Sequence, residues 1–153
     1  MIKELLLKKG WAGKTISRAE TVARLNPLIE RHIRLNHLYA FAAREHGDQA
    51  TREALAASQK IARTNVGKIA ETIYSCGGTA YTGVDLEPDG ANLGTDPEAM
   101  LATLSEAEQQ FLDAVLDEEK VEHQMRTRAI LGVVASSSSA RLEILRGLKR
   151  DRR

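Results

Sequence analysis

The sequence predicts an all-α protein in which four long helices pack as an antiparallel bundle with a long crossover loop. Alanine and leucine are abundant, whereas aromatic residues make up only 4% of the 153 residues, and strands prefer aromatic and β-branched residues. Apolar residues recur at steps of three, four and seven, which places them on one face of a helix. Glycine and proline gather in residues 79–95, so the loop is expected there.

Residues 1–24 are predicted to form a short helical arm ahead of a bundle that spans residues 25–150. Met1–Lys9 has the composition of a short helix. Ser17 and Glu20 then have the spacing of a capping box, in which each side chain satisfies a free backbone amide at a helix start.

Asn26 and Pro27 mark the expected start of the first bundle helix. Asparagine caps helices well, and proline at the first helical position loses no hydrogen bond. We expect the helix to begin or restart at Pro27, and one long helix with a kink there is the alternative. The helix should end near Glu45, just before Gly47.

A second helix is expected from about Gln49 to Cys76 and should end at Gly77 and Gly78, because glycine accepts the left-handed conformation of a helix C-terminus. Its apolar face consists of Leu55, Ala62, Val66, Ile69 and Ile73. Loops as long as residues 79–95 are uncommon inside compact domains. This loop is therefore interpreted as a crossover that carries the chain from one end of the bundle to the other.

Asp96 followed by Pro97 predicts the start of the third helix, since aspartate caps helices and proline fits the first position. Two positions for the turn into the fourth helix remain open. Similar helix lengths favour a turn near Leu116–Glu118, and the turn preference of serine favours Ser136–Ser139. In the second case the last helix is short and begins at Ala140.

The order of these segments resembles the ferritin-like superfamily. Leu25–Glu30, Tyr39–Ala43 and a helix that closes on Gly77–Thr79 carry the resemblance in the first half. In the second half it rests on a helix with Glu108 after the crossover and on an acid-rich segment with His123. The pattern is most similar to small bacterial ferritin-like families of unassigned function, and it covers most of the chain.

Active members of this superfamily bind two metal ions with a glutamate on each of two helices and Glu-x-x-His on each of the other two. The resemblance implies that Glu30 matches the glutamate of the first helix. It also implies that Glu108 matches the glutamate of the third helix.

The two Glu-x-x-His motifs are incomplete in this sequence. The slot for the second-helix motif falls near Ile61 and Thr64, which cannot replace glutamate and histidine as ligands. Three residues before His123 stands Lys120, although Glu119 lies four residues before it and still shares its helix face. The resemblance therefore implies a degenerate metal centre.

Helical phase, at about 100° per residue, places polar side chains among the apolar ones independently of any resemblance. In the second half, the apolar stripe that runs through Val115, Ile130 and Val133 includes several of them. The polar residues inside the stripes are His32, Asn36, Ser58, Asn65, Glu108, Glu119 and Arg126, with Glu122 and His123 at the edges. A buried carboxylate costs several kcal/mol unless it meets a cation, hydrogen-bond donors or a metal.

These buried acids and histidines have three interpretations. The first is a metal site, for Fe or Mn, or a small-ligand site, made by Glu119, His123 and His32 with Glu108 or Glu122 in support. The second is an internal network of ion pairs and hydrogen bonds, for example Glu122 with Arg126 one helical turn away. The third is that these positions face a subunit interface.

Composition argues against several partner classes. A net charge of +1 provides no field to recruit nucleic acid or an acidic membrane, and no apolar run approaches the ~20 residues of a membrane span. The first nine residues lack an apolar region long enough for a signal peptide. Cys76 is the single cysteine, so no internal disulfide can form, and we expect a cytoplasmic protein.

We therefore expect a ferritin-like bundle with a degenerate metal centre that serves as a structural or interaction module. Apolar faces on helices longer than one bundle predict a homodimer or a larger homo-oligomer. The alternative is an Fe- or Mn-binding oxidoreductase or metal-storage protein with an unusual carboxylate–histidine site.

Overall fold

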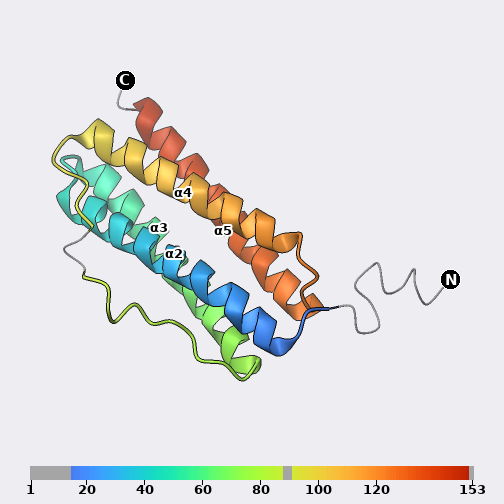
Figure 1. The fold of residues 1–153 in the computed structure, drawn as a ribbon. Coiled ribbons are helices and arrows are strands. Elements are labelled where there is room, and N and C mark those ends of the chain that lie inside the picture. Colours follow the sequence, from blue (N-terminus) through green and yellow to red (C-terminus); the bar gives the residue numbers. More distant parts are fainter. Residues whose placement is uncertain (1–14, 88–90, 152–153) are drawn as a thin grey trace.

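The protein is an all-helical bundle, as the sequence predicts. A computed structural model describes residues 15–87 and 91–151. The described part contains four helices: α2 (Arg18–Glu45), α3 (Gln49–Ser75), α4 (Pro97–Glu119) and α5 (Met125–Asp151). Helix α2 packs against α3 and α4, and α5 packs against the same two helices. Figure 1 shows that α2 and α5 run in one direction along the bundle and that α3 and α4 run in the opposite direction, so the long connection returns the chain from the end of α3 to the other end of the bundle.

The predicted start of the first bundle helix at Pro27 is wrong. Helix α2 begins at Arg18, and Pro27 lies inside it. Ser17 is the N-cap, and its Oγ accepts a hydrogen bond of 3.1 Å from the backbone amide of Glu20. A proline inside a helix loses one backbone hydrogen bond, but Leu25 and neighbouring leucines bury their side chains on this face and keep the helix continuous. Residues 1–14 of the predicted arm lie outside the described part.

Asn26 fastens the loop that follows α3 instead of capping a helix. Its side-chain amide donates to the carbonyl of Thr79 at 3.0 Å, and its Oδ1 accepts from the amide of Tyr81 at 2.8 Å. The described parts of the connection between α3 and α4 extend alongside α2 in Figure 1. The long connection thus has a specific anchor on α2.

The end of α3 agrees with the double-glycine prediction. Gly77 has a φ of 82°, a conformation that suits glycine. A Cβ on Gly78 would lie 2.5 Å from a methyl group of Val22, so this position needs glycine because α2 approaches closely.

The turn between the last two helices lies at residues 120–124, close to the first of the two predicted positions. The serine run Ser136–Ser139 lies inside α5, so a turn at these serines is wrong. Because α4 and α5 are separate helices, the apolar stripe does not continue in phase from one to the other. Val133 and Arg126, which the continuous stripe places inside, are exposed on α5.

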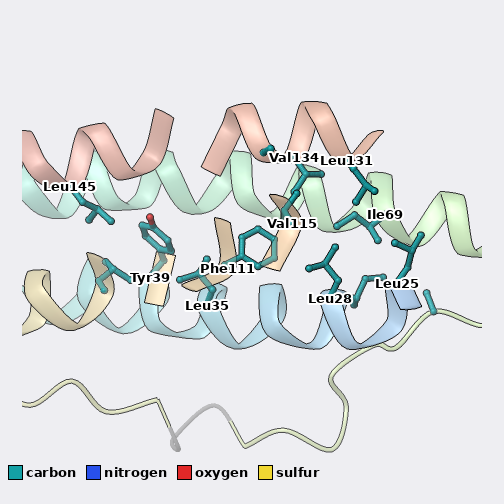
Figure 2. Close-up of a cluster of buried hydrophobic side chains, with 14 of the residues drawn as sticks. Leu25, Leu28, Leu35, Tyr39, Ile69, Phe111, Val115, Leu131, Val134 and Leu145 are labelled. Carbon is teal, nitrogen blue, oxygen red and sulfur yellow. The ribbon is translucent and has the colours of Figure 1, made fainter. Parts of the chain in front are cut away.

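The core runs along the whole bundle between the four helices (Figure 2). Figure 2 places Tyr39 between Leu145 on one side and Phe111 on the other. The hydrophobic cluster includes Leu25, Leu28, Ile29, Leu35, Leu55, Ile69, Ile73, Leu101, Leu104, Val115, Leu131 and Val134. Among the described residues, none of the helices combines the length and the apolar character that a membrane span requires.

Candidate interior polar site

A carboxylate lies at the centre of the bundle with every one of its acceptor positions in use. Glu108 of α4 is completely buried. Its Oε1 accepts from the Tyr39 hydroxyl at 2.6 Å and from Arg141 Nε at 2.6 Å. Its Oε2 accepts from Ser138 Oγ at 2.7 Å and from Arg141 Nη2 at 3.1 Å. The donors come from α2 and α5, so this cluster joins three helices.

The charge of Glu108 is neutralised by Arg141, which is 1% exposed. The two side chains form a bidentate ion pair, the geometry in which a planar guanidinium binds a carboxylate most strongly. Burying two charges is costly, and such a pair is maintained when the remaining donors and acceptors are satisfied. For the carboxylate, Tyr39 and Ser138 donate the remaining hydrogen bonds.

Tyr39 is held in its protonated form. Burial raises the pKa of its hydroxyl far above the ordinary range, and the neighbouring negative charge of Glu108 raises it further. The hydroxyl therefore acts as a hydrogen-bond donor over the physiological pH range.

His32 is buried on α2 as the helical phase predicts, and it carries no charge at neutral pH. Burial, followed by the positive charge of Arg141, lowers the pKa of His32 to about 3. Its ring lies against Phe111 with the centroids 4.2 Å apart and the planes tilted by 40°. Neither ring nitrogen has a hydrogen-bond partner in residues 15–87 and 91–151.

Several other buried polar atoms also have no hydrogen-bond partner among the described residues. Asn36 Oδ1, Asn65 Nδ2 and Arg141 Nη1 also lack a partner in the described part of the chain. Asn36, Asn65 and Ser58 are buried, as their position among the apolar residues of α2 and α3 predicts. Buried polar side chains therefore occur along α2 and α3 as well as around Glu108.

His123 and the acids near it form a separate cluster at the turn between α4 and α5. His123 Nε2 donates to Glu118 Oε1 at 2.6 Å, and the same oxygen accepts from Arg24 Nε at 2.6 Å. His123 is 1% exposed. The partner of His123 is therefore Glu118 rather than the predicted Glu119.

The remaining predicted site residues lie toward the surface. Glu122 pairs with Arg128 at 3.1 Å rather than with Arg126. Glu119 is half-buried and makes no hydrogen bond or ion pair within the described residues. Glu30, the counterpart of a metal-binding glutamate by resemblance, has a 45% exposed side chain and lies 3.6 Å from Arg34.

The structure does not bring the five predicted ligands into one coordination sphere. In residues 15–87 and 91–151, no group of three or more histidine, cysteine, aspartate or glutamate side chains is placed to hold a metal ion. Glu108 and His32 lie in the interior, whereas His123, Glu119 and Glu122 lie at the α4–α5 turn. These residues do not fit the two-metal centre that the resemblance implies.

Arg141, Ser138, Tyr39 and Glu118 are the site residues that sequence reasoning did not identify. A signal for the first two exists, because residues 134, 138, 141 and 145 of α5 follow helical spacing and all four are buried. An arginine in that register must meet an acid inside the bundle.

A shallow hollow of about 180 Å³ opens on the surface between α2 and α4. Arg31 and Arg34 line it together with Leu35 and Phe111. The Phe111 ring also lies against His32, so this side chain contacts both the hollow and the interior histidine.

Compared with models of known families and with curated protein sequences, the chain matches neither a family model nor a curated sequence.

Proposed function

We propose that the protein is a ferritin-like helical bundle with a degenerate metal centre that acts as a structural or interaction module and forms a homo-oligomer. The observation that carries this proposal is the Glu108–Arg141 pair in the middle of the bundle. In this position a guanidinium ion provides the positive charge that a metal ion provides in the active members of the superfamily.

The hydrogen bonds of Glu108 support the replacement. A carboxylate offers about four lone-pair positions, and Tyr39, Ser138 and Arg141 together donate four hydrogen bonds to it. A metal ion would have to displace the guanidinium and break a buried ion pair, which costs about 3–5 kcal/mol when one partner is lost.

A second candidate function rests on His32. Both of its ring nitrogens lack a hydrogen-bond partner among the residues that the structure describes, and a buried histidine that is uncharged at neutral pH is the form that binds metals. The alternative is therefore an Fe- or Mn-binding oxidoreductase or storage protein in which Arg141 moves away and His32 and Glu108 bind the metal.

Measuring the metal content of the protein distinguishes the metal-free module from the metal-binding protein. The purified protein is incubated anaerobically with Fe²⁺ or Mn²⁺, dialysed, and its metal content is measured by elemental analysis. We expect less than stoichiometric metal for the wild type. Stoichiometric binding that is lost in His32→Ala and Glu108→Gln would replace the first proposal by the second.

A second pair of variants covers the predicted site at the turn. Glu119→Ala and His123→Ala test whether any bound metal belongs to the α4–α5 turn. Metal that disappears in these variants and persists in Glu108→Gln would also contradict a metal-free module, and it would locate the site away from the interior pair.

A further inference from the structure

The groove between α2 and α4 has arginines on its α2 side, and the first of them meets an acid across the groove. Arg24 on α2 forms an ion pair of 2.6 Å with Glu118 on α4. Arg31 follows Arg24 by about two helical turns, so it lies on the same face of α2. Among residues 15–87 and 91–151, however, Arg31 has no acidic partner. Its positive charge is therefore available to an anion from outside the chain.

The hollow of about 180 Å³ lies at this point of the groove, and its polar side chains can donate hydrogen bonds. Arg31 and Arg34 contribute guanidinium groups from α2, and Gln110 contributes an amide from α4. No aspartate or glutamate lines the hollow in the part of the chain that the structure describes. The contact of Arg34 with Glu30 is 3.6 Å long and solvent-exposed, so it holds Arg34 only weakly.

Charge distinguishes this hollow from two others on the described surface. A hollow of about 280 Å³ that also contains Arg34 includes Glu87, and one of about 600 Å³ beside Pro27 includes Glu30. In each of these two, a carboxylate of the protein itself is part of the lining. The hollow between α2 and α4 presents cations and donors without an acid, so a negatively charged ligand suits it best.

The floor of the hollow is apolar. Leu35 and Phe111 line it, and each of these core residues is 2% exposed. Figure 2 shows the Phe111 ring next to Leu35. On α4, Ala107 also lines the hollow, and a larger side chain at this position would occupy part of the space. A ligand here can therefore rest an apolar group on the floor while its charge meets the arginines.

We propose that this hollow is a binding site for a short-chain organic acid. The carboxylate accepts hydrogen bonds from Arg31 and Arg34, because a planar guanidinium matches the two oxygens of a carboxylate. The alkyl chain lies on Leu35 and Phe111, where apolar surface is removed from water.

The volume of the hollow sets the size of the acid. At about 30 Å³ for each non-hydrogen atom, which is the share of a water molecule in the liquid, 180 Å³ accommodates about six such atoms. Butyrate has this size. A protein partner would instead need a contact surface of about 800 Å² on each side, which is far more than this hollow offers. The occupant is therefore a free acid and not a segment of another protein.

The test is an NMR titration of the full-length protein with sodium butyrate, in which sodium chloride is lowered to keep the ionic strength constant. We expect saturable shifts of the Arg31 and Arg34 side-chain Nε–H signals and of the Phe111 ring. The dissociation constant should be on the order of millimolar, because the ligand is small. The His32 ring should shift in the same titration, since its centroid lies 4.2 Å from that of Phe111.

Two related compounds separate the contribution of the charge from that of the apolar chain. Butanol retains the chain and lacks the charge, so it should bind about tenfold more weakly than butyrate if each arginine contributes about threefold. Acetate retains the charge and lacks two methylene groups, so it should bind about fivefold more weakly. Equal affinity for butanol and butyrate would overturn an anion site, and equal affinity for acetate and butyrate would overturn the role of the apolar floor.

Arginine variants test the charged side of the hollow. Arg31→Gln and Arg34→Gln should each weaken butyrate binding about threefold, and the double variant should weaken it about tenfold. Arg44→Gln is the matched control, because Arg44 is an exposed arginine near the end of the same helix and does not line the hollow. It should leave the affinity unchanged.

Ala107→Leu tests the hollow itself without a change of charge. The larger side chain should occupy the space above the floor, so the saturable shifts should disappear although both arginines remain. Leucine has a high helix propensity, and circular dichroism verifies that this variant and the arginine variants remain helical.

Shifts with butyrate that are absent or do not saturate in the wild type would overturn the inference. Binding that persists unchanged in Ala107→Leu, or in the double arginine variant, would overturn it as well. None of these results depends on the metal content or on the oligomeric state, so the failure of this site is distinguishable from the failure of the proposed function.

Discussion

Glu108 and Arg141 depend on each other because both are buried and each is the charge partner of the other. Arg141→Met should lower the free energy of unfolding by about 3–5 kcal/mol, since the Glu108 carboxylate then remains inside without a cation. Glu108→Gln should have a cost of similar size, because it leaves the guanidinium unpaired. The measurement is urea denaturation at pH 7, followed by circular dichroism.

The double variant Glu108→Gln/Arg141→Met contains neither charge and provides the control. We expect it to be more stable than the sum of the two single losses predicts, with a coupling free energy of about 1–3 kcal/mol. Additive losses would contradict a direct ion pair as the reason for the burial of Glu108.

His32 should make the protein sensitive to mild acid. Its pKa in the folded protein is about 3, below the ordinary value near 6.5, so between these values the unfolded chain binds a proton that the folded chain does not. The free energy of unfolding therefore does not depend on His32 above about pH 6.5. Between the two pKa values it falls by about 1.4 kcal/mol for each pH unit of acidification.

The variant His32→Leu isolates this contribution. Free energies of unfolding are measured at pH 7 and pH 5 for both proteins, and the wild type should lose about 2 kcal/mol more than the variant over this interval. Equal losses would show that His32 titrates normally in the folded protein.

Within helix α5, adjacent serines should respond in opposite directions to the same substitution. Ser138→Ala removes a charge-assisted hydrogen bond to Glu108 and should lower the free energy of unfolding by about 1–2 kcal/mol. Ser139→Ala changes an exposed position and should raise it slightly, because alanine has the higher helix propensity. Thermal unfolding of the two variants, whose chemistry is identical, checks the difference, and equal effects would contradict the assigned faces of α5.

Local sequence signals predicted those helix ends that are fixed by a capping side chain close in sequence. Asp96 caps α4 with Pro97 at its first position, and the Ser17 cap is present at α2. The signals failed at Pro27 and in the serine run Ser136–Ser139. At both, burial of apolar residues on the same face outweighs a local preference for a break, because packing contributes more than helix propensity.

The candidate site was predictable to the extent that it depends on phase within a single helix. Glu108 and His32 are buried because they stand at core positions of α4 and α2. The partner of His123 was not predictable, because the turn at residues 120–124 resets the helical phase and selects Glu118 instead of Glu119. The donors around Glu108 come from α2 and α5, so their identity depends on how these two helices are placed against α4. A single sequence does not reveal that relative placement of the helices.

At the scale of the whole molecule, one cluster connects the beginning of α2 to the turn between α4 and α5. Glu118 accepts from Arg24 on α2 and from the buried His123 in the turn. A backbone hydrogen bond of 2.8 Å from Ile16 to Glu122 lies beside it. The first segment that the structure describes is thereby attached to a turn about a hundred residues later in the chain.

Glu118→Ala should loosen both segments together. The substitution leaves His123 Nε2 without its acceptor, and an unsatisfied buried donor costs about 1–3 kcal/mol. Hydrogen exchange should therefore accelerate at the beginning of α2 and in residues 120–124 in the same variant. Asp117→Ala is the matched control, since the Asp117–Lys120 pair is about three-quarters exposed and worth little. Faster exchange in the turn alone would show that Glu118 fixes only the turn, and that the start of α2 is held by the packing of its apolar face.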